Sequence, residues 1–267
     1  MNYFLFTKIS AQLVVSSSIA ILCVGAIGML QIAQLNRLIN REKAISLETL
    51  RQGINSEELH LNLIKKTPTV GFDNLLADWI FLNFLQYFGD DKARDMTGYS
   101  LSPKYFDIIV DRDPRFLGTY IGLSTSISMY AGMPEKSVAL MEKALKSMSP
   151  QSPPKSYYVW RYKGIDELLF LGNAQAARQS FEKAAEWAST YSDEESKYVA
   201  ALSRKTAEFL SRNPKSKFAQ VNTWAMVLTT TTDTRARKIA ISRIEALGGK
   251  VIVTPEGAVK IRLPPKD

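Results

Sequence analysis

The stretch Leu171–Ala188, LGNAQAARQSFEKAAEWA, decides the fold of this chain. Its Gly-Asn pair predicts a tight turn, and the residues that follow have the spacing of an amphipathic helix. Ala177, Phe181 and Ala184 are separated by four and then three residues, so they share one helical face. The small alanines let a second helix approach closely, and Phe181 fills the remaining space. We therefore expect this stretch to form half of a helical hairpin.

The same plan recurs towards the N-terminus. Ile109, Ala144 and Ala184 lie 35 and 40 residues apart, close to the period of about 34 of a tetratricopeptide repeat. The pattern of small and aromatic residues after a glycine turn resembles the second helix of that repeat. The resemblance implies a solenoid of antiparallel helical hairpins that binds other proteins. The predicted repeat positions are Phe106, Ile109, Gly132, Met141, Ala144, Gly172, Ala177, Phe181 and Ala184.

A second resemblance covers residues 70–190. The motifs GF at 71–72, ADW at 77–79, YFG at 87–89 and DPRF at 113–116, after an N-terminal apolar span, are similar to those of a group of proteins from Gram-negative bacteria and cyanobacteria. That group consists of membrane-anchored, tetratricopeptide-like proteins. The resemblance implies an envelope or thylakoid setting and a role in protein interaction.

The N-terminal run 9–33 is uncharged and mostly apolar. About twenty such residues cross the hydrocarbon core of a bilayer, so the run predicts a transmembrane helix. A cleaved signal peptide is the alternative, although its apolar region is usually shorter and ends at a small-x-small site. We expect a single-pass protein of the bacterial inner membrane or the thylakoid. Lysine and arginine flank the run on both sides, which leaves the side of the C-terminal domain open.

The predicted architecture is all-α, with two additions. The alternation of Val251 and Val253, and then of Val259, Ile261 and Leu263, predicts a small β-hairpin that covers one end of the helical stack. The expected organisation is a transmembrane anchor at 1–35, a connector at 36–70, tetratricopeptide-like repeats at 71–230, and a C-terminal helix with the hairpin cap at 231–267.

The sequence offers little for catalysis. One cysteine, Cys23, and one histidine, His60, exclude an intramolecular disulfide and a Cys/His metal cluster within the chain. No glycine-rich phosphate loop, HExxH or GxSxG motif occurs. Asp111, Asp113 and the pair Asp166-Glu167 come closest to paired carboxylates. We interpret Asp113, which precedes a proline, as a helix stop and Asp166-Glu167 as a solvated helical face. We therefore predict no enzymatic activity, no catalytic residue, no cofactor and no metal.

The block Gly71–Asp90, GFDNLLADWIFLNFLQYFGD, is the most aromatic part of the chain and predicts a helix buried on most sides. Asp78 is the exception, because a carboxylate in so apolar a helix needs a partner, for which Arg112 and Arg115 are candidates, or faces a site. The candidate binding residues are Asp78, Trp79, Tyr87, Tyr120, Tyr130 and Trp160.

The resulting functional hypothesis is a membrane-tethered scaffold or assembly factor. Its repeat groove would bind an extended or helical segment of a partner protein, with a membrane complex among the candidates. One alternative is a binding protein for an apolar ligand or lipid that uses the aromatic block 72–88. A second is binding of nucleic acid or an anionic membrane by the basic C-terminal helix. The net charge of +8 comes from dispersed residues, so we expect no nucleic acid. The basic residues of that helix are Arg235, Arg237, Lys238 and Arg243.

Overall fold

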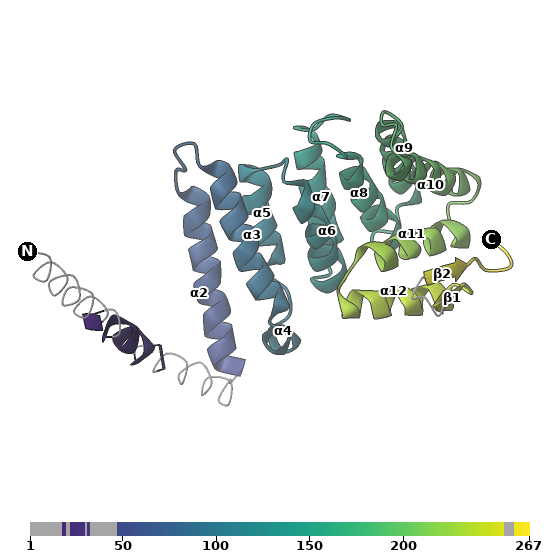
Figure 1. Ribbon diagram of the computed structural model, residues 1–267. Coiled ribbons are helices and arrows are strands. Elements are labelled where there is room, and N and C mark those ends of the chain that lie inside the picture. Colours follow the sequence, from purple (N-terminus) through teal and green to yellow (C-terminus); the bar gives the residue numbers. More distant parts are fainter. Residues whose placement is uncertain (1–17, 20–21, 30, 33–46, 254–258) are drawn as a thin grey trace, which may run out of the picture. The chain divides into compact units, whose positions relative to one another are not determined.

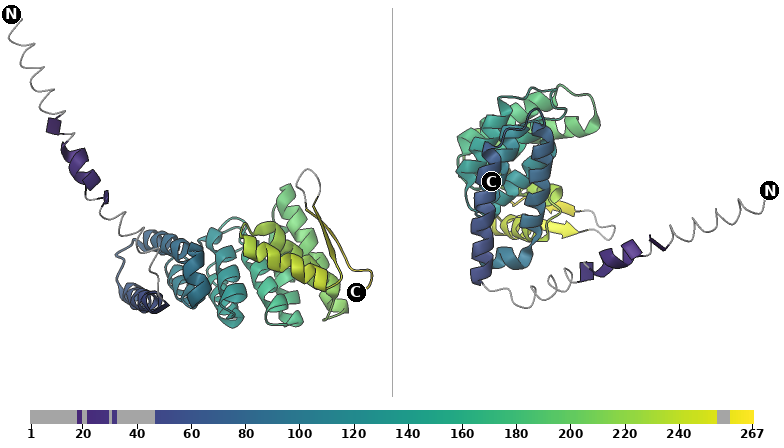
Figure 2. Two further views of the ribbon diagram at one scale, coloured as in Figure 1. Left: turned by 90° about the horizontal axis from the view of Figure 1, so that it is seen from below. Right: turned by 90° about the vertical axis from the view of Figure 1, so that its left-hand side faces the viewer.

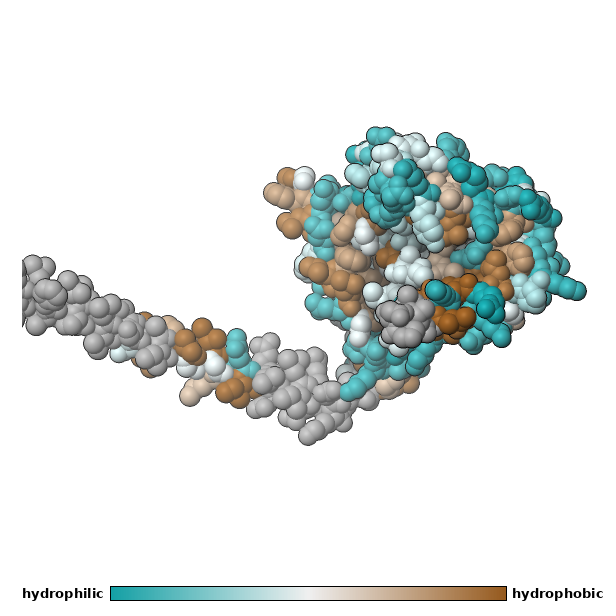
Figure 3. Space-filling view, turned by 45° about the vertical axis from the view of Figure 1, so that its right-hand side comes forward, coloured by the Kyte–Doolittle hydropathy of each residue, from teal (hydrophilic) through white to brown (hydrophobic). Residues whose placement is uncertain are grey.

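A computed structural model describes residues 18–19, 22–29, 31–32, 47–253 and 259–267 of the chain. The chain divides into two compact units, residues 1–53 and 54–267. In the first unit the described residues are helical, and most of them are exposed. Figure 3 shows apolar residues, in brown, along the short helical pieces of this unit.

The predicted transmembrane helix is wrong for the structure described. No helix of the described residues is long and apolar enough to cross a membrane. Within the predicted span 9–33, the longest described piece covers residues 22–29, well short of the about twenty residues that a span needs. The remainder of that span lies outside the described residues. The same finding corrects the predicted membrane-anchored fold and the predicted single-pass membrane localisation.

The second unit is almost entirely helical, as Figure 1 shows. Its helices pack mostly on helices near them in the chain, with the most extensive contacts between α8 and α9 and between α9 and α10. The elements, including the start of α2 before residue 54, are α2 (Leu47–Lys66), α3 (Asp73–Gly89), α4 (Asp91–Thr97), α5 (Ser102–Arg112), the 3₁₀ turn η1 (Leu117–Thr119), α6 (Tyr120–Leu123), the π-helix η2 (Ser124–Tyr130), α7 (Pro134–Leu145), α8 (Tyr157–Leu169), α9 (Ala174–Ala188), α10 (Glu194–Arg212), α11 (Lys217–Thr230), α12 (Thr234–Ala246), β1 (Lys250–Val253) and β2 (Val259–Arg262).

The sequence explains where several helices begin and turn. Asn173, Asp193, Ser216 and Asp233 each accept a hydrogen bond from the backbone N–H three residues later, which satisfies a donor that the first helical turn leaves free. Gly132 and Gly172 both have φ +65° and connect η2 to α7 and α8 to α9. Glycine adopts this left-handed conformation without steric cost, so equivalent turns recur in successive hairpins.

The α8–α9 hairpin contains the stretch Leu171–Ala188, which was predicted to form half of a helical hairpin. Ala177, Phe181 and Ala184 are fully buried. Opposite Phe181, Gly164 of α8 has no side chain, and a Cβ there would lie 3.2 Å from the Phe181 ring. The absence of a side chain at Gly164 is therefore what lets the two helices approach around the aromatic ring.

The coarse prediction of a mainly helical chain with a small C-terminal hairpin is confirmed. β1 and β2 pair antiparallel, with Lys250 opposite Arg262 and Val253 opposite Val259. In the range expected to be a connector, 36–70, the structure instead has α2, which ends at Lys66, shortly before Pro68. The part of that range at 36–46 lies outside the described residues.

Helix α12 folds back across the second unit, which the sequence did not predict. It runs below α6 and α8 in Figure 1, and the view from below in Figure 2 shows it lying over the row of helices. Arg235 reaches Asp91 at 3.2 Å and Asp95 at 3.0 Å, both on α4, and donates to the Tyr99 hydroxyl at 3.1 Å. The Tyr130 hydroxyl donates to Asp233, the N-cap of α12. The C-terminal helix thus connects parts of the chain that are more than a hundred residues apart.

Candidate functional site

Helix α3 presents two apolar sides. Its inner side carries Ala77, Ile80 and Phe84, which are buried, and Phe84 packs edge-on against Phe106 of α5 at 4.5 Å between ring centroids. Large apolar side chains on its other side, or just before its start, remain exposed. We call these residues the outer face of α3: Phe72 (67% exposed), Leu75 (65%), Trp79 (44%), Leu82 (57%) and Leu85 (47%).

The expectation that this helix is buried on most sides is therefore wrong. Helix α5 covers one side of α3, and His60 of α2 contacts Trp79, but among the described residues no element covers the rest of the outer face. Asp78 is exposed, and its carboxylate makes no hydrogen bond or ion pair with another described residue. Arg112, a predicted partner of Asp78, instead donates to Asp73 at 3.0 Å, and Arg115 donates to the Ser147 carbonyl at 3.1 Å.

Two of the predicted binding residues, Trp79 and Tyr87, line the same groove. The groove lies between α2 and α3, within the second unit, and has a volume of about 340 Å³. His60 of α2 packs edge-on against Trp79 at 6.0 Å. The hydroxyl of Tyr87 accepts a hydrogen bond from the backbone N–H of Leu101 at 3.2 Å, so its polar atom supports the fold. The groove is lined by Glu57, His60, Trp79, Asn83, Gln86, Tyr87, Asp90, Arg94 and Tyr105.

The other predicted binding residues lie apart from this groove. Tyr120 is fully buried and donates to the Pro114 carbonyl at 2.6 Å. Burial raises its pKa far above the ordinary value of a tyrosine. Tyr130 is half-buried and donates to Asp233, while Trp160 packs edge-on against Trp187 at 5.9 Å. The structure therefore gives these three residues contacts within the fold, and it does not bring all the candidates to one site.

The pair Asp166-Glu167 is the feature that sequence reasoning missed most clearly. The interpretation as a solvated face is wrong, because both residues are buried. Asp166 accepts hydrogen bonds from Ser124 and Ser128 at 2.6 Å and from Ser137 at 2.5 Å. Burial raises the pKa of Asp166 to about 7, although the three hydroxyl donors favour its charged form.

Glu167 belongs to a second buried group. Lys163, one helical turn earlier, forms an ion pair with it, and Ser180 of α9 donates to its other carboxylate oxygen at 2.5 Å. Lys163 also lies 3.3 Å from the exposed Glu142 of α7. These contacts link α7, α8 and α9 through hydrogen-bonded charges. We interpret both polar groups as packing devices of the helical stack.

The basic C-terminal helix uses two of its predicted contact residues internally. Arg235 is held by Asp91 and Asp95, and Arg237 donates to the Leu228 carbonyl at 2.9 Å. Only Lys238 and Arg243 then remain of the proposed basic surface, which weakens the alternative of nucleic-acid binding, because affinity for phosphates grows with the number of contacts. Among the described residues, no group of three or more His, Cys, Asp or Glu side chains could hold a metal ion.

Comparison with known proteins does not assign the chain to a family. The chain matches no protein-family model. No curated protein is significantly similar to it, and no solved structure is either.

Proposed function

We propose that this chain is a non-enzymatic scaffold that binds an amphipathic helix of a partner protein on the outer face of α3. The exposed apolar row itself is the observation that carries the proposal. Phe72, Leu75, Trp79 and Leu82 follow each other at intervals of three, four and three residues, which is the spacing of one helical face. A partner helix binds such a face with apolar residues at the same spacing.

The size of the exposed side chains supports an interface. Single exposed apolar residues are normal on protein surfaces, but a contiguous row is typical of an interaction site. Trp79 combines a large ring with partial burial against His60, so it is already ordered and would lose little entropy on binding. Tryptophan is enriched among the residues that dominate binding energy.

The charges around the row favour a basic partner. Helix α3 contains no lysine or arginine, and although its Asp73 is paired with Arg112, its Asp78 is not paired with another described residue. Asp78 is exposed beside the row, and Glu57 and Asp90 line the adjacent groove. The partner helix would therefore combine an apolar face with basic residues at its edge. An anionic bilayer suits this surface less well, because interfacial helices bind lipid with Lys and Arg.

The kinship with tetratricopeptide repeats remains part of the proposal. It is supported by the equivalent turns at Gly132 and Gly172 and by the buried repeat positions Met141, Ala144 and Ala177. Binding through a repeat groove is less well supported than binding through α3, because α12 lies across the stack. The aromatic-block alternative is also weaker, since Phe81, Phe84 and Phe88 pack against the core and the adjacent groove is mostly polar.

Site-specific crosslinking tests the proposal. A photo-reactive benzoylphenylalanine replaces Leu82 in one variant and Glu182, exposed on α9, in a control variant. Crosslinking takes place in cells, and mass spectrometry maps the crosslinked peptides. We expect Leu82 crosslinks to map to one amphipathic segment of a partner. A synthetic peptide of that segment should bind the parent protein and lose at least tenfold in affinity with the double variant Leu75→Ser, Leu82→Ser.

Three results would contradict the proposal. Crosslinks only to a second copy of the chain would replace partner binding by self-association. Crosslinks only to lipid would replace it by membrane contact. If the variant at position 82 crosslinks no more specifically than the control at position 182, the α3 surface is not a specific binding site. The double variant must melt like the parent, which is expected because Leu75 and Leu82 are exposed.

A further inference from the structure

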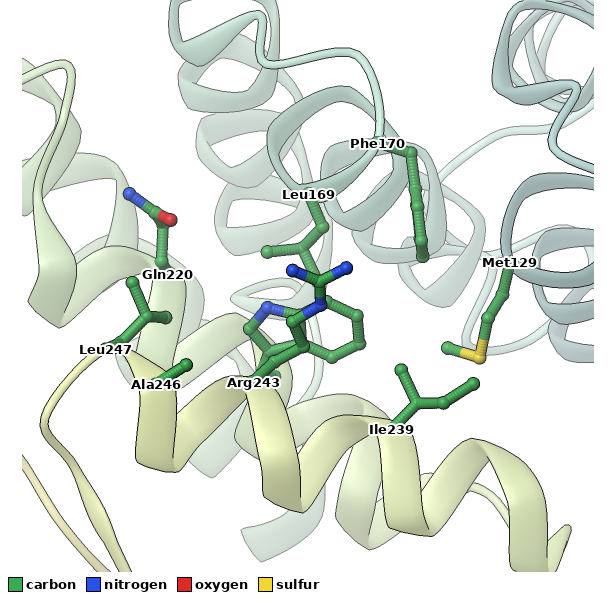
Figure 4. Close-up of a pocket in the computed structure, with 9 residues that line it drawn as sticks. Met129, Leu169, Phe170, Gln220, Ile239, Arg243, Ala246 and Leu247 are labelled. Atoms are coloured by element: carbon green, nitrogen blue, oxygen red, sulfur yellow. The ribbon is translucent and has the colours of Figure 1, made fainter.

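A second cavity lies beneath α12, far in sequence from the outer face of α3. Its volume is about 500 Å³, within the range of small-molecule sites. Residues of η2, α8, α11 and α12 line it, and Figure 4 shows how their side chains lie. The lining residues are Met129 of η2, Leu169 and Phe170 at the end of α8, Gln220 and Trp224 of α11, Ile239, Arg243 and Ala246 of α12, and Leu247.

The lining is apolar except at two positions. Trp224 is almost fully buried and packs edge-on against Phe170 at 5.9 Å between ring centroids. Such aromatic walls, together with Met129, Leu169 and Ile239, bind the hydrocarbon body of a ligand. Gln220 and Arg243 are the polar lining residues, and Arg243 alone is charged at neutral pH. A few polar groups in an apolar pocket fix the orientation of a ligand.

Arg243 differs from the two other arginines of its helix. Arg235 is paired with carboxylates, and Arg237 donates to backbone carbonyls. The guanidinium of Arg243 has no hydrogen-bond acceptor or acidic partner among the described residues. In Figure 4 it extends into the space between Leu169 and Ile239. Arg243 is exposed, so its unpaired guanidinium is accessible from solvent, and an arginine–carboxylate pair with two parallel hydrogen bonds would fix a ligand there.

We infer that this cavity binds a small organic carboxylate with an apolar, ring-sized body. Arg243 pairs with the carboxylate, Gln220 adds a hydrogen bond, and Phe170 and Trp224 contact the apolar body. This site is independent of the partner-binding surface proposed for α3. It also gives the ligand-binding alternative a different location from the aromatic block.

Isothermal titration with a matched pair of probes tests the inference. The probes are 2-naphthoate and 2-naphthalenemethanol, which share the ring system and differ in charge. We expect the parent protein to bind the acid with a Kd below about 1 mM and at least tenfold more tightly than the alcohol. Arg243→Gln should remove this preference, whereas Lys238→Gln, an exposed change on the same helix outside the cavity, should preserve it.

A third variant tests the location. Ala246 lines the cavity but is exposed, so Ala246→Phe should fill the space without disturbing the core and should weaken both probes. Equal affinities for acid and alcohol would overturn the inference, as would unchanged binding in Arg243→Gln or Ala246→Phe. No saturable binding up to about 1 mM would also overturn it. Each variant is checked by its thermal melting curve, so that a folding defect is not read as a loss of binding.

Discussion

At the scale of single residues, Asp166 carries the clearest pH dependence. Its carboxylate is fully buried, and burial raises its pKa to about 7 from the ordinary value of 3.8. At a pH between these two pKa values, Asp166 is protonated in the folded chain and ionised in the unfolded chain. The free energy of unfolding therefore falls as pH rises from about 4 to about 7 through this group. Above about pH 7, the stability that the protonated Asp166 provides is lost.

We predict that Asp166→Asn abolishes this part of the pH dependence. The amide is neutral at every pH and can still exchange hydrogen bonds with Ser124, Ser128 and Ser137. Between pH 5 and pH 8, the parent should lose about 2 kcal/mol of stability relative to the variant. Urea denaturation at the two pH values measures the difference. Asp78→Asn is the matched control, because it makes the same substitution at an exposed position of the second unit. The same pH dependence in Asp166→Asn and the parent would contradict the assignment.

The contrast between Phe181 and Asp166 shows what single positions reveal in a sequence. The burial of Phe181 follows from spacing, because apolar residues at helical intervals predict a buried face. Asp166 does not, because an aspartate beside a glutamate on a helix is usually solvated. Its hydrogen-bond donors lie 29 to 42 residues away in the sequence, and only the packing of η2 and α7 on α8 brings the serines to the carboxylate.

At the scale of elements, the α8–α9 hairpin depends on Gly164. A Cβ at this position would already lie 3.2 Å from the ring of Phe181. We predict that Gly164→Val destabilises the protein by about 1–3 kcal/mol, because the added methyl groups overpack the contact. Gly89→Val is the matched control. Gly89 ends α3 and has open space around its Cα, so this change should stay within about 0.5 kcal/mol.

A double variant identifies the cause of the Gly164 effect. Phe181→Leu removes ring volume opposite the new side chain. If overpacking is the cause, the pair Gly164→Val, Phe181→Leu should be less destabilised than the sum of the two single variants. Chemical denaturation of the four proteins provides the comparison. A strictly additive result, or a Gly164→Val variant as stable as the parent, would show that the close approach of α8 and α9 does not depend on the glycine.

Elements were more predictable from sequence than their surroundings. The helices at 174–188 and 234–246 and the hairpin at 250–262 follow from periodicity and turn residues. The exposure of α3 was not predictable, because apolar residues around a whole helix indicate burial unless one knows what packs on each side. The π-helix η2 left no signal in its sequence, since serine, isoleucine and methionine also occur in ordinary helices. The predicted binding residues were the least reliable part of the prediction. Half of them, Tyr120, Tyr130 and Trp160, are aromatic residues that pack within the fold.

At the scale of the whole molecule, α12 near the C-terminus contacts α4 in the N-terminal part of the second unit. Arg235 joins Asp91 and Asp95 across more than a hundred residues of sequence. The two carboxylates are 71% and 64% exposed, so solvent screens these ion pairs and they contribute little to global stability. We therefore expect their role to be local, at the contact between the start of α12 and α4.

We predict that Arg235→Glu separates α12 from α4 with little effect on the melting temperature. The reversed charge repels both aspartates and removes the donor to Tyr99, while the core of the stack remains intact. Amide hydrogen exchange should become faster in α12 and in α4 together, and stay unchanged in α9. Charge reversal on α4, with Asp91→Lys and Asp95→Lys added, should restore slow exchange in both helices. Faster exchange confined to α12 would show that the effect is local to that helix, and failure of the reversed charges to restore protection would exclude the ion pairs as the link.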